Sequence, residues 1–291
     1  AQVHPFMILT VPLVIEKIIK GKVLPIINKP VMKVLWKTPG IKCLLHKKVR
    51  NTLLDAFGGE LRFLIIGGAA LNEEVEKCMK DMHFPYCVGY GMTECAPLVT
   101  YEDWYKYVYR SCGKGIVGME MRIDSEDPAT KEGELQLRGV NVMMGYYKNP
   151  QATAETIDEE GWLHTGDMGI IDEKNNIFIK GRCKNMLLGP SGQNIYPESI
   201  EAKLTNMPFV SECIVTQKDN KLIALVYPDY AAMDESHIEK DQLTIIMEEN
   251  RLNLNKEIAS YEAVSKIIIH NSEFEKTPKK SIKRYLYENL A

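Results

Sequence analysis

The residues whose types could bind a ligand or take part in a reaction are densest in the glycine-rich stretch at residues 89–94. This stretch follows an apolar run. Glycines after a strand let the backbone approach a ligand closely. Tyr90 offers a flat face for a nucleobase, and Thr93 offers a hydroxyl to a phosphate. Glu94 offers a hard oxygen ligand of the kind that Mg²⁺ prefers. The alternative interpretation of the hexapeptide alone is an ordinary turn between a strand and a helix, with a surface glutamate.

A second group lies at residues 161–167, where Asp167 follows Thr165 and Gly166. A carboxylate placed after a glycine turn can accept two charge-assisted hydrogen bonds from a ribose diol. Taken alone, an aspartate in a β-turn is the commoner explanation. His164 in the same stretch is interpreted as a packing or turn residue rather than as a catalytic base.

A third group, at residues 180–198, combines glycine turns with basic side chains at a change in composition. Arg182 could form a bidentate contact with ribose or phosphate oxygens. The alternative is a plain interdomain linker whose charges are solvated.

The elements around these groups predict an α/β fold. Residues 61–66 form a buried-strand pattern that ends at Gly67 and Gly68, and residues 86–90 form the next strand. Asn72 can cap a helix between them, and Leu13 to Lys20 reads as a short helix after Pro12. The order strand, helix, strand indicates a parallel sheet.

Two further regions differ in pattern. Residues 105–181 contain short strand-like runs separated by turn residues, which predicts a small antiparallel subdomain. Residues from about 184 onward predict a compact α+β domain of about 100 residues. Its long helix, at residues 239–256, carries an apolar stripe expected to consist of Leu243, Ile246, Met247 and Leu252.

Composition excludes several classes of protein. Hydrophobic residues make up 45% of the 291 residues and charged residues 26%, and the net charge is −3. These values are typical of a globular protein and do not indicate nucleic-acid binding. The seven cysteines are odd in number and form no CxxC motif, which favours a reduced, cytoplasmic protein. The apolar run at residues 6–19 is too short to span a bilayer, and we expect the chain to be a fragment of a longer protein.

The order of these groups resembles the adenylate-forming (AMP-dependent) superfamily, which includes acyl-CoA synthetases, peptide-synthetase adenylation domains and luciferases. Residues 67–71 match the family's adenine-side glycine loop, and residues 89–94 its Tyr-Gly-x-Thr-Glu motif. Residues 133–135, with Gly139 and residues 145–147, match its Gly-Glu…Gly…Gly-Tyr motif. Residues 165–167 match its ribose motif, and residues 181–201 its hinge region. The subtype is similar to bacterial long-chain fatty acid–CoA ligases, from the stretches at residues 196–201 and 275–278.

The resemblance implies a domain organisation and a two-step reaction. Residues 1–182 would be the later part of the large AMP-binding domain, α/β over 1–104 and β-rich over 105–182. Residues 183–185 would be a hinge, and residues 186–291 a mobile carboxy-terminal α+β domain. A carboxylate would react with Mg·ATP to give acyl-AMP and pyrophosphate, and the thiol of coenzyme A would then displace AMP. Rotation of the second domain would separate the two steps.

The resemblance also implies roles for individual residues. Thr93 would contact the α-phosphate, Glu94 would hold Mg²⁺, and Lys184 occupies the hinge position. Gly192 would lie along the thiol channel. Adenine would be held by Gly68, Ala69 and Tyr90, and ribose by Asp167 and Arg182. The full nucleotide-binding set would consist of Gly68, Ala69, Ala70, Gly89, Tyr90, Gly91, Thr93, Asp167, Ile179 and Arg182.

The sequence departs from the family at two points. The Ser/Thr/Gly-rich phosphate loop that ends in Lys-Gly does not occur in these residues, so we expect this chain to be inactive alone. Ser281 stands where the family places its adenylation lysine, and a serine is neutral and too short to reach a phosphate. Lys280 or Lys283 could substitute through a shift of the loop, the first step could be weakened, or the alignment could be out of register.

Several functions therefore remain as hypotheses. The leading one is an acid–thiol ligase that activates a carboxylate, with a long-chain fatty acid as the expected substrate. The alternatives are an acyl–acyl-carrier-protein synthetase, a non-catalytic adenylate-binding protein, and a luciferase-like oxygenase that nothing in the sequence favours. The lysines between residues 17 and 50 could give weak peripheral contact with an anionic membrane, although a solvated helix face is the simpler explanation.

Overall fold

The computed structural model describes residues 3–277 and 281–287, and it divides into two compact units, Ala1–Ile179 and Lys180–Ala291. Each unit has apolar clusters of its own and is described by itself. The predicted hinge at residues 183–185 falls a few residues after the boundary, and its role as a hinge stays a prediction.

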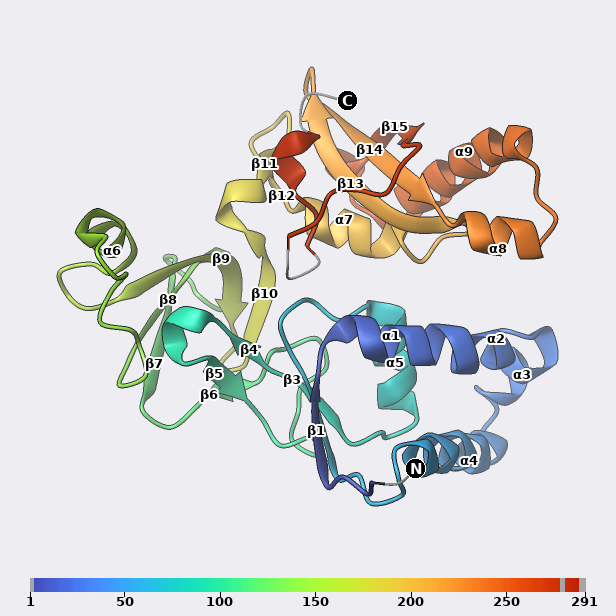
Figure 1. Cartoon of the computed structure of the whole chain (residues 1–291), viewed down its shortest axis with the longest axis horizontal. Coiled ribbons are helices and arrows are strands. Elements are labelled where there is room, and N and C mark those ends of the chain that lie inside the picture. Colours follow the sequence, from blue (N-terminus) through green and yellow to red (C-terminus); the bar gives the residue numbers. More distant parts are fainter. Residues whose placement is uncertain (1–2, 278–280, 288–291) are drawn as a thin grey trace. The chain divides into compact units, whose positions relative to one another are not determined.

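The first unit begins with a parallel three-stranded sheet in the order β1-β2-β3, formed by Met7–Thr10, Phe63–Ile66 and Tyr86–Val88 (Figure 1). Strand β1 pairs with β2 from Met7 opposite Phe63, and β2 pairs with β3 from Leu64 opposite Tyr86. The parallel sheet predicted from β2 and β3 is confirmed. Strand β1 was not predicted, because its four residues merge into the apolar run of the following helix.

Helices lie between these strands in sequence. They are α1 (Pro12–Ile18), which continues as the π-helical turn η1 (Ile19–Val23), α2 (Leu24–Ile27), α3 (Pro30–Leu35), α4 (Ile41–Ala56) and α5 (Glu73–Asp81). Proline stands in the first turn of α1, α2 and α3, where its missing N–H is not needed. The predicted cap at Asn72 is confirmed, because its side-chain oxygen accepts the backbone N–H groups of Glu74 and Val75.

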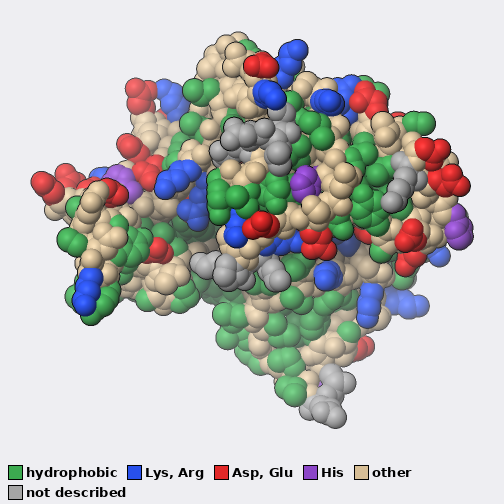
Figure 2. All heavy atoms as spheres, turned by 45° about the horizontal axis from the view of Figure 1, so that its top comes forward, with side chains coloured by type: hydrophobic (Ala, Val, Ile, Leu, Met, Phe, Trp, Pro, Cys, Tyr) green, Lys and Arg blue, Asp and Glu red, His purple; other side chains and the backbone are tan. Residues whose placement is uncertain are grey.

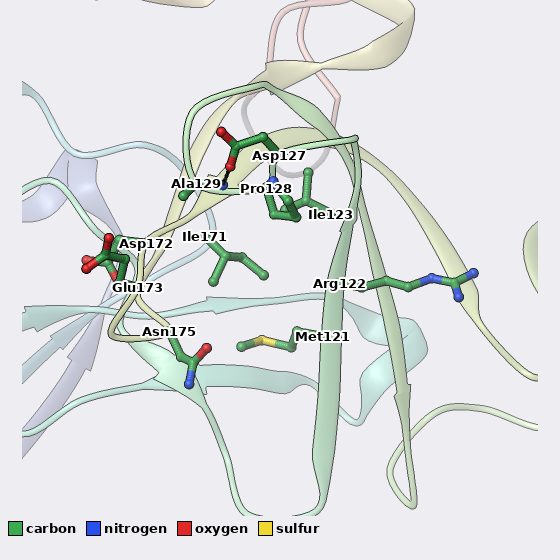
Figure 3. A pocket seen from close by; sticks show the side chains of 10 residues that line it. All are labelled: Met121, Arg122, Ile123, Asp127, Pro128, Ala129, Ile171, Asp172, Glu173 and Asn175. Atoms are coloured by element: carbon green, nitrogen blue, oxygen red, sulfur yellow. Dashed lines mark hydrogen bonds between the residues drawn. The ribbon is translucent and has the colours of Figure 1, made fainter.

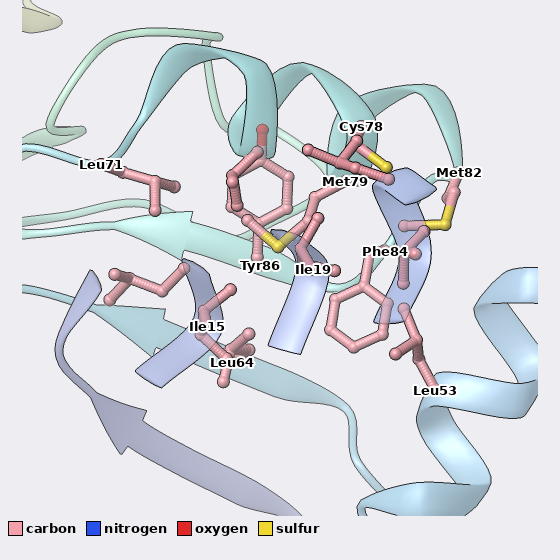
Figure 4. Packing of buried hydrophobic residues seen from close by; sticks show 14 of the residues in the cluster. Ile15, Ile19, Leu53, Leu64, Leu71, Cys78, Met79, Met82, Phe84 and Tyr86 are labelled. Atoms are coloured by element: carbon pink, nitrogen blue, oxygen red, sulfur yellow. The ribbon is translucent and has the colours of Figure 1, made fainter. Parts of the chain in front are cut away.

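Apolar side chains from α1, η1, α4, α5 and the sheet pack into one cluster (Figure 4). Ile66 and Val75 are completely buried, and Met79 and Leu64 are each 1% exposed. The lysines predicted to be exposed lie outside this cluster. Those at 29, 33, 37, 42, 47 and 48 are all exposed, and none of them forms an ion pair with another described residue. Membrane contact by this segment stays a prediction.

The rest of the first unit is antiparallel, as predicted for residues 105–181, but the antiparallel pairing already begins at Tyr90, inside the range predicted as α/β. A small sheet has the order β4-β5-β6, formed by Tyr90–Gly91, Leu98–Tyr101 and Lys114–Gly115. A larger sheet has the order β10-β9-β8-β7, and its last strand continues past Ile179, where the first unit ends. Its strands are β7 (Met119–Asp124), β8 (Gly133–Gly139), β9 (Leu163–Ile171) and β10 (Ile177–Arg182), with helix α6 (Pro150–Thr156) between β8 and β9. Leu135, Leu137, Leu163 and Ile177 form its fully buried centre.

The second unit contains a mixed sheet in the order β13-β14-β15, formed by Val210–Lys218, Lys221–Pro228 and Val264–Ile269. Asp219 and Asn220 connect β13 to β14, and both have positive φ, as a type I′ hairpin turn requires. The remaining elements are the hairpin of β11 (Leu187–Leu188) and β12 (Asn194–Ile195), and the helices α7 (Pro197–Leu204), α8 (Tyr230–Glu235) and α9 (Lys240–Glu257).

Helix α9 buries a stripe that differs from the predicted one. Leu243 and Met247 are buried as expected, but Leu252 is 48% exposed and Leu254 is completely buried. The buried positions follow the spacing of 3.6 residues per turn through Asn250, which is 2% exposed. Asn250 fits among apolar side chains because its amide donates to the backbone oxygen of Pro208 at 2.8 Å.

The α/β class with a parallel layer, an antiparallel subdomain and a final α+β unit is thus confirmed. On the face shown in Figure 2, side chains of both charges are mixed over the upper part of the view, and a largely hydrophobic region with few charges lies below them. Among the helices of the described residues, none combines the length and apolarity needed to cross a bilayer.

Candidate functional site

The glycine stretches lie where two neighbouring parallel strands end. Gly67 and Gly68 follow β2, and Gly89 follows β3, with the N–H of Gly89 donating to the oxygen of Ile66 at 2.9 Å. A Cβ on Gly89 would approach the oxygen of Thr100 to 3.0 Å, so glycine allows this close packing. Gly68 has a φ of +89°, and it is exposed together with Ala69 and Ala70. Ligands of α/β proteins bind at such carboxyl ends of strands.

Tyr90 is fixed at both its backbone and its ring. Its N–H donates to the hydroxyl of Thr100 at 3.0 Å, and its phenol donates to Asp167 Oδ2 at 2.5 Å. Its ring is partly buried against the apolar cluster of the antiparallel sheet, as is the side chain of Ile179. A Cβ on Gly91 would lie only 2.2 Å from the oxygen of Pro97, so this position excludes any side chain. The structure therefore brings the first two predicted groups together.

Asp167 lies on a bulge of β9. Gln136 on β8 pairs with His164 and Glu134 pairs with Met168, so the single residue Leu135 faces three residues of β9. The hydroxyl of Thr165 spans the gap by donating to the oxygen of Leu135 at 2.7 Å. Bulges of this kind redirect a side chain away from the regular ladder.

The bulge holds the Asp167 carboxylate in a defined place. The N–H of Asp167 donates to the hydroxyl of Thr165 at 3.0 Å, and the N–H of Gly166 donates to Glu134 Oε1 at 2.8 Å. Gly166 has a φ of +68°, which favours glycine here. The Asp167 residue is 6% exposed. A carboxylate has about four acceptor positions and can accept more than one hydroxyl, so the residue type fits a role in holding a diol.

Glu94 lies in the 3₁₀ turn Thr93–Cys95, directly after β4. Its Oε1 accepts the phenol of Tyr146 at 2.9 Å, and its backbone oxygen accepts the N–H of Met143 at 2.8 Å. Thr93 beside it is exposed. Within the described residues there is no group of three or more His, Cys, Asp or Glu side chains arranged to hold a metal. A single carboxylate fits Mg²⁺ that is shared with phosphate oxygens and water, which is how that ion usually binds.

His164 is not buried as a simple packing residue. Its Nδ1 lies 2.8 Å from Glu134 Oε2, and its Nε2 lies 3.5 Å from Asp158 Oδ2. The hydrogen bond with Glu134 raises the pKa of His164 above its usual value, and Asp158 acts in the same direction. Sequence reasoning matched Glu134 to a family motif but did not predict its contacts, because they depend on the pairing of β8 with β9.

The predicted residues of the hinge region belong to the second unit. Arg182 and Lys184 are exposed. Gly192 is exposed with a φ of +80°, and a Cβ there would meet no atom within 4 Å. Asn185 donates to Glu198 Oε1 at 2.5 Å, which anchors the turn after Lys184 to the start of α7. The roles of Arg182, Lys184 and Gly192 remain predictions.

The tail around Ser281 is also part of the second unit. Ser281 is exposed, and its backbone oxygen accepts the N–H of Thr277 at 2.8 Å. Lys280 lies outside the described residues. Lys283 pairs with Glu275 at 3.2 Å, and Lys276 forms an ion pair with Glu212.

Arg284 anchors the tail through an ion pair with Glu201, which also accepts the N–H of Val215 at 2.6 Å. Burial raises the pKa of Glu201 to about 7, although the positive charge of Arg284 acts in the opposite direction. The contact fixes the chain directly after the serine position.

Two hollows of the surface involve other residues. One, of about 330 Å³, lies between β7 and the turn that joins β9 to β10, and none of its lining residues is a predicted site residue (Figure 3). The other, of about 470 Å³, is lined by residues 144–154 and includes Tyr146, the partner of Glu94. The candidate site is therefore described by the polar contacts of Tyr90, Glu94 and Asp167.

Residues 2–147 match the family model described as AMP-binding enzyme. The chain belongs to this family. The match covers the glycine stretches, Tyr90, Glu94 and Tyr146, and it ends before the bulge that carries Asp167.

Comparisons with individual proteins agree with this assignment. The chain is 27% identical over 292 residues to 4-coumarate–CoA ligase 3 of Oryza sativa subsp. japonica. The aligned region covers 96% of this chain and 51% of that protein. It therefore spans about half the length of this relative. Curated relatives of this kind are 4-coumarate ligases, so the narrower prediction of a long-chain fatty acid ligase is not confirmed.

Solved structures show the same fold. The adenylation domain of a carboxylate reductase from Mycobacterium chelonae has a TM-score of 0.74 at 22% identity, over 98% of this chain and 45% of that one. O-succinylbenzoate coenzyme A synthetase of Bacillus subtilis, in complex with ATP and magnesium ion, has a TM-score of 0.64 at 21% identity, over 82% and 49%.

Proposed function

We propose that the intact natural protein is an ATP-dependent acid–thiol ligase. A carboxylate oxygen of the acid would bond to the α-phosphorus of ATP as the bond to the bridging oxygen breaks, which releases pyrophosphate. The thiolate of coenzyme A would then bond to the acyl carbon of the acyl-AMP, and AMP would leave. The observation that carries this proposal is the contact of Tyr90 with Asp167, which brings together the two motifs that we propose to bind the nucleotide.

Each residue of the candidate site then has a chemical task. The ring of Tyr90 and the backbone of Gly68 and Ala69 would flank adenine, while Asp167 would accept the ribose hydroxyls. Thr93 would donate to the α-phosphate. Magnesium held by Glu94 would offset the negative charge that develops on the phosphates. Further contacts are proposed for Ala70, Gly89, Gly91, Ile179 and Arg182 with the nucleotide, for Lys184 as the hinge, and for Gly192 along the thiol channel.

For the acid we propose a long-chain fatty acid, on the sequence of residues 196–201 and 275–278. The relatives named for 4-coumarate make an aromatic acid the competing candidate. Both named activities use coenzyme A, which favours it over a carrier protein as acceptor. Thioester formation by the intact protein with palmitate and with 4-coumarate, each with coenzyme A, separates the two acids. If the protein prefers 4-coumarate, the proposed substrate becomes an aromatic acid instead of a fatty acid, and the proposed reaction stays the same.

The nucleotide site is tested by titrating a non-hydrolysable acyl-adenylate analogue into the intact protein by calorimetry. Replacing Asp167 with alanine removes two charge-assisted hydrogen bonds, so we expect affinity to fall by roughly 100-fold or more. Asp124→Ala is the matched control, since Asp124 is exposed at the end of β7 and should bind normally. Equal affinity of the Asp167 variant and the wild type would contradict the assignment.

A further inference from the structure

One side chain connects the bulge of Asp167 to a histidine. Glu134 uses Oε1 to accept the N–H of Gly166, and it uses Oε2 to contact His164 Nδ1, both at 2.8 Å. The bulge has left the regular ladder of β8 and β9, so the N–H of Gly166 depends on this side chain for a partner. Glu134 is thus placed to control the backbone that presents Asp167.

His164 in turn lies between two carboxylates. Glu134 faces Nδ1 and Asp158 faces Nε2, so an imidazolium could donate toward both. Gln136, its neighbour across the strands, is uncharged. Its Nε2, which can only donate, lies 3.3 Å from Nδ1 and competes there with Glu134, whose oxygen is closer at 2.8 Å. The side chains of His164 and Glu134 are 35% and 24% exposed, so solvent screens their interaction only in part.

Nearby positive charges are directed elsewhere. Arg122 on β7 lies 3.8 Å from Asp158 and 3.9 Å from Glu160, and its Nε donates to Gln136 at 2.6 Å. Arg138 on β8 pairs with Glu120 at 2.6 Å. Arg122 therefore weakens the effect of Asp158 on His164, whereas neither arginine forms an ion pair with Glu134. The hydrogen bond with Glu134 is the largest cause of the raised pKa of His164, and partial burial of the imidazole acts in the opposite direction.

We propose that His164 is a positioning residue of the nucleotide site, acting through Glu134 on the bulge that presents Asp167, and that its protonated form is the one that orders this bulge. The inference rests on the proposed function, because it assigns a task to the same site. The imidazolium strengthens the contact with Glu134 into a charge-assisted hydrogen bond, which fixes the carboxylate against the N–H of Gly166.

The direction of the pH effect follows from the geometry. The pKa of His164 is raised by its carboxylate neighbours, so the ordered form is fully present below the ordinary histidine range. The ordered form is lost as the pH rises through the raised pKa of His164 in the folded protein. Nucleotide affinity should fall over the same interval, by about fivefold, the difference between a charge-assisted and a neutral hydrogen bond.

The experiment measures the dissociation constant of the non-hydrolysable acyl-adenylate analogue from about pH 6 to about pH 9, across the range in which histidines titrate. The intact wild-type protein is compared with His164→Asn, in which an amide can replace Nδ1–H but carries no charge. Glu134→Gln removes the carboxylate at the centre of the linkage. His83→Asn is the matched control, because His83 is an exposed histidine of the same unit whose φ of 54° asparagine tolerates.

The inference is supported if the affinity of the wild type and of His83→Asn falls as the pH rises. His164→Asn and Glu134→Gln should then show the same affinity at every pH, equal to the weaker affinity of the wild type at high pH. The ¹H NMR titration of His164 should follow the wild-type profile. If His164 has a packing role alone, His164→Asn should lower the affinity by the same factor at every pH, and this result would overturn the inference. A pH profile of His164→Asn equal to that of the wild type would also overturn it. No binding by folded wild type at any pH would instead overturn the proposed function itself, and the inference with it.

Discussion

The bulge that carries Asp167 and the tail that carries Ser281 are built in opposite ways. Asp167 is nearly buried, and hydrogen bonds from Gly166 to Glu134 and from its own N–H to Thr165 fix its turn. Ser281 is exposed, and the described lysines near it form ion pairs with glutamates of their own unit. The region proposed to bind the nucleotide holds a carboxylate in a defined place, whereas the region expected to supply a cation to the phosphate presents a neutral side chain on an anchored backbone.

Among the substitutions that test this comparison, we expect the largest effect from breaking the ion pair of Glu201 with Arg284, which anchors the tail. Glu201→Ala leaves the guanidinium of Arg284, whose side chain is 21% exposed, without its partner, which should lower the free energy of unfolding of the second unit by about 3 kcal/mol. Chemical denaturation checks this value. Glu249→Ala, an exposed change on α9, should have little effect, and an equally small effect for Glu201→Ala would show that the tail has another anchor.

A smaller effect is expected from restoring the missing cation. Ser281→Lys places an ammonium where the resemblance predicts the family's adenylation lysine, so pyrophosphate exchange by the intact protein should rise by about tenfold, equivalent to about 1.4 kcal/mol of transition-state stabilisation. Ser236→Lys adds the same charge at an exposed site on the second unit and should not change the rate. An unchanged rate for Ser281→Lys would mean that another group already serves the phosphate or that the register differs.

The smallest effect is expected at Lys283. Its pair with Glu275 is screened by solvent, so Lys283→Ala should leave the free energy of unfolding nearly unchanged. Pyrophosphate exchange should stay within about twofold of wild type if this lysine has no catalytic task. A large loss of exchange with unchanged stability would assign the adenylation role to Lys283, and would remove the contrast between the two regions.

Local features of the sequence predicted local structure well. The cap at Asn72, the turn after β13 and the glycine stretches each depend on residues that are neighbours in the chain. The contact of Tyr90 with Asp167 joins positions 77 residues apart, and only the pairing of strands brings them together. For that reason the sequence identified both residues through a family resemblance but could not show that they touch.

Errors arose where a pattern had two explanations. The apolar run at residues 6–19 contains both β1 and α1, and hydropathy alone does not mark the boundary between them. Leu252 was assigned to the buried stripe because it is apolar, whereas the helical period selects Asn250 and Leu254. The polar Asn250 is accommodated by a carbonyl from another segment, which sequence periodicity does not represent.

The hydrogen bond between the Tyr90 phenol and Asp167 also gives the protein a built-in reporter. A ligand that engages the carboxylate must alter this bond, and with it the electron density of the ring. A fluorine atom placed beside the phenol oxygen of Tyr90 would therefore shift its ¹⁹F resonance when the site fills. Occupancy could then be followed in solution at a single atom, without labelling the ligand.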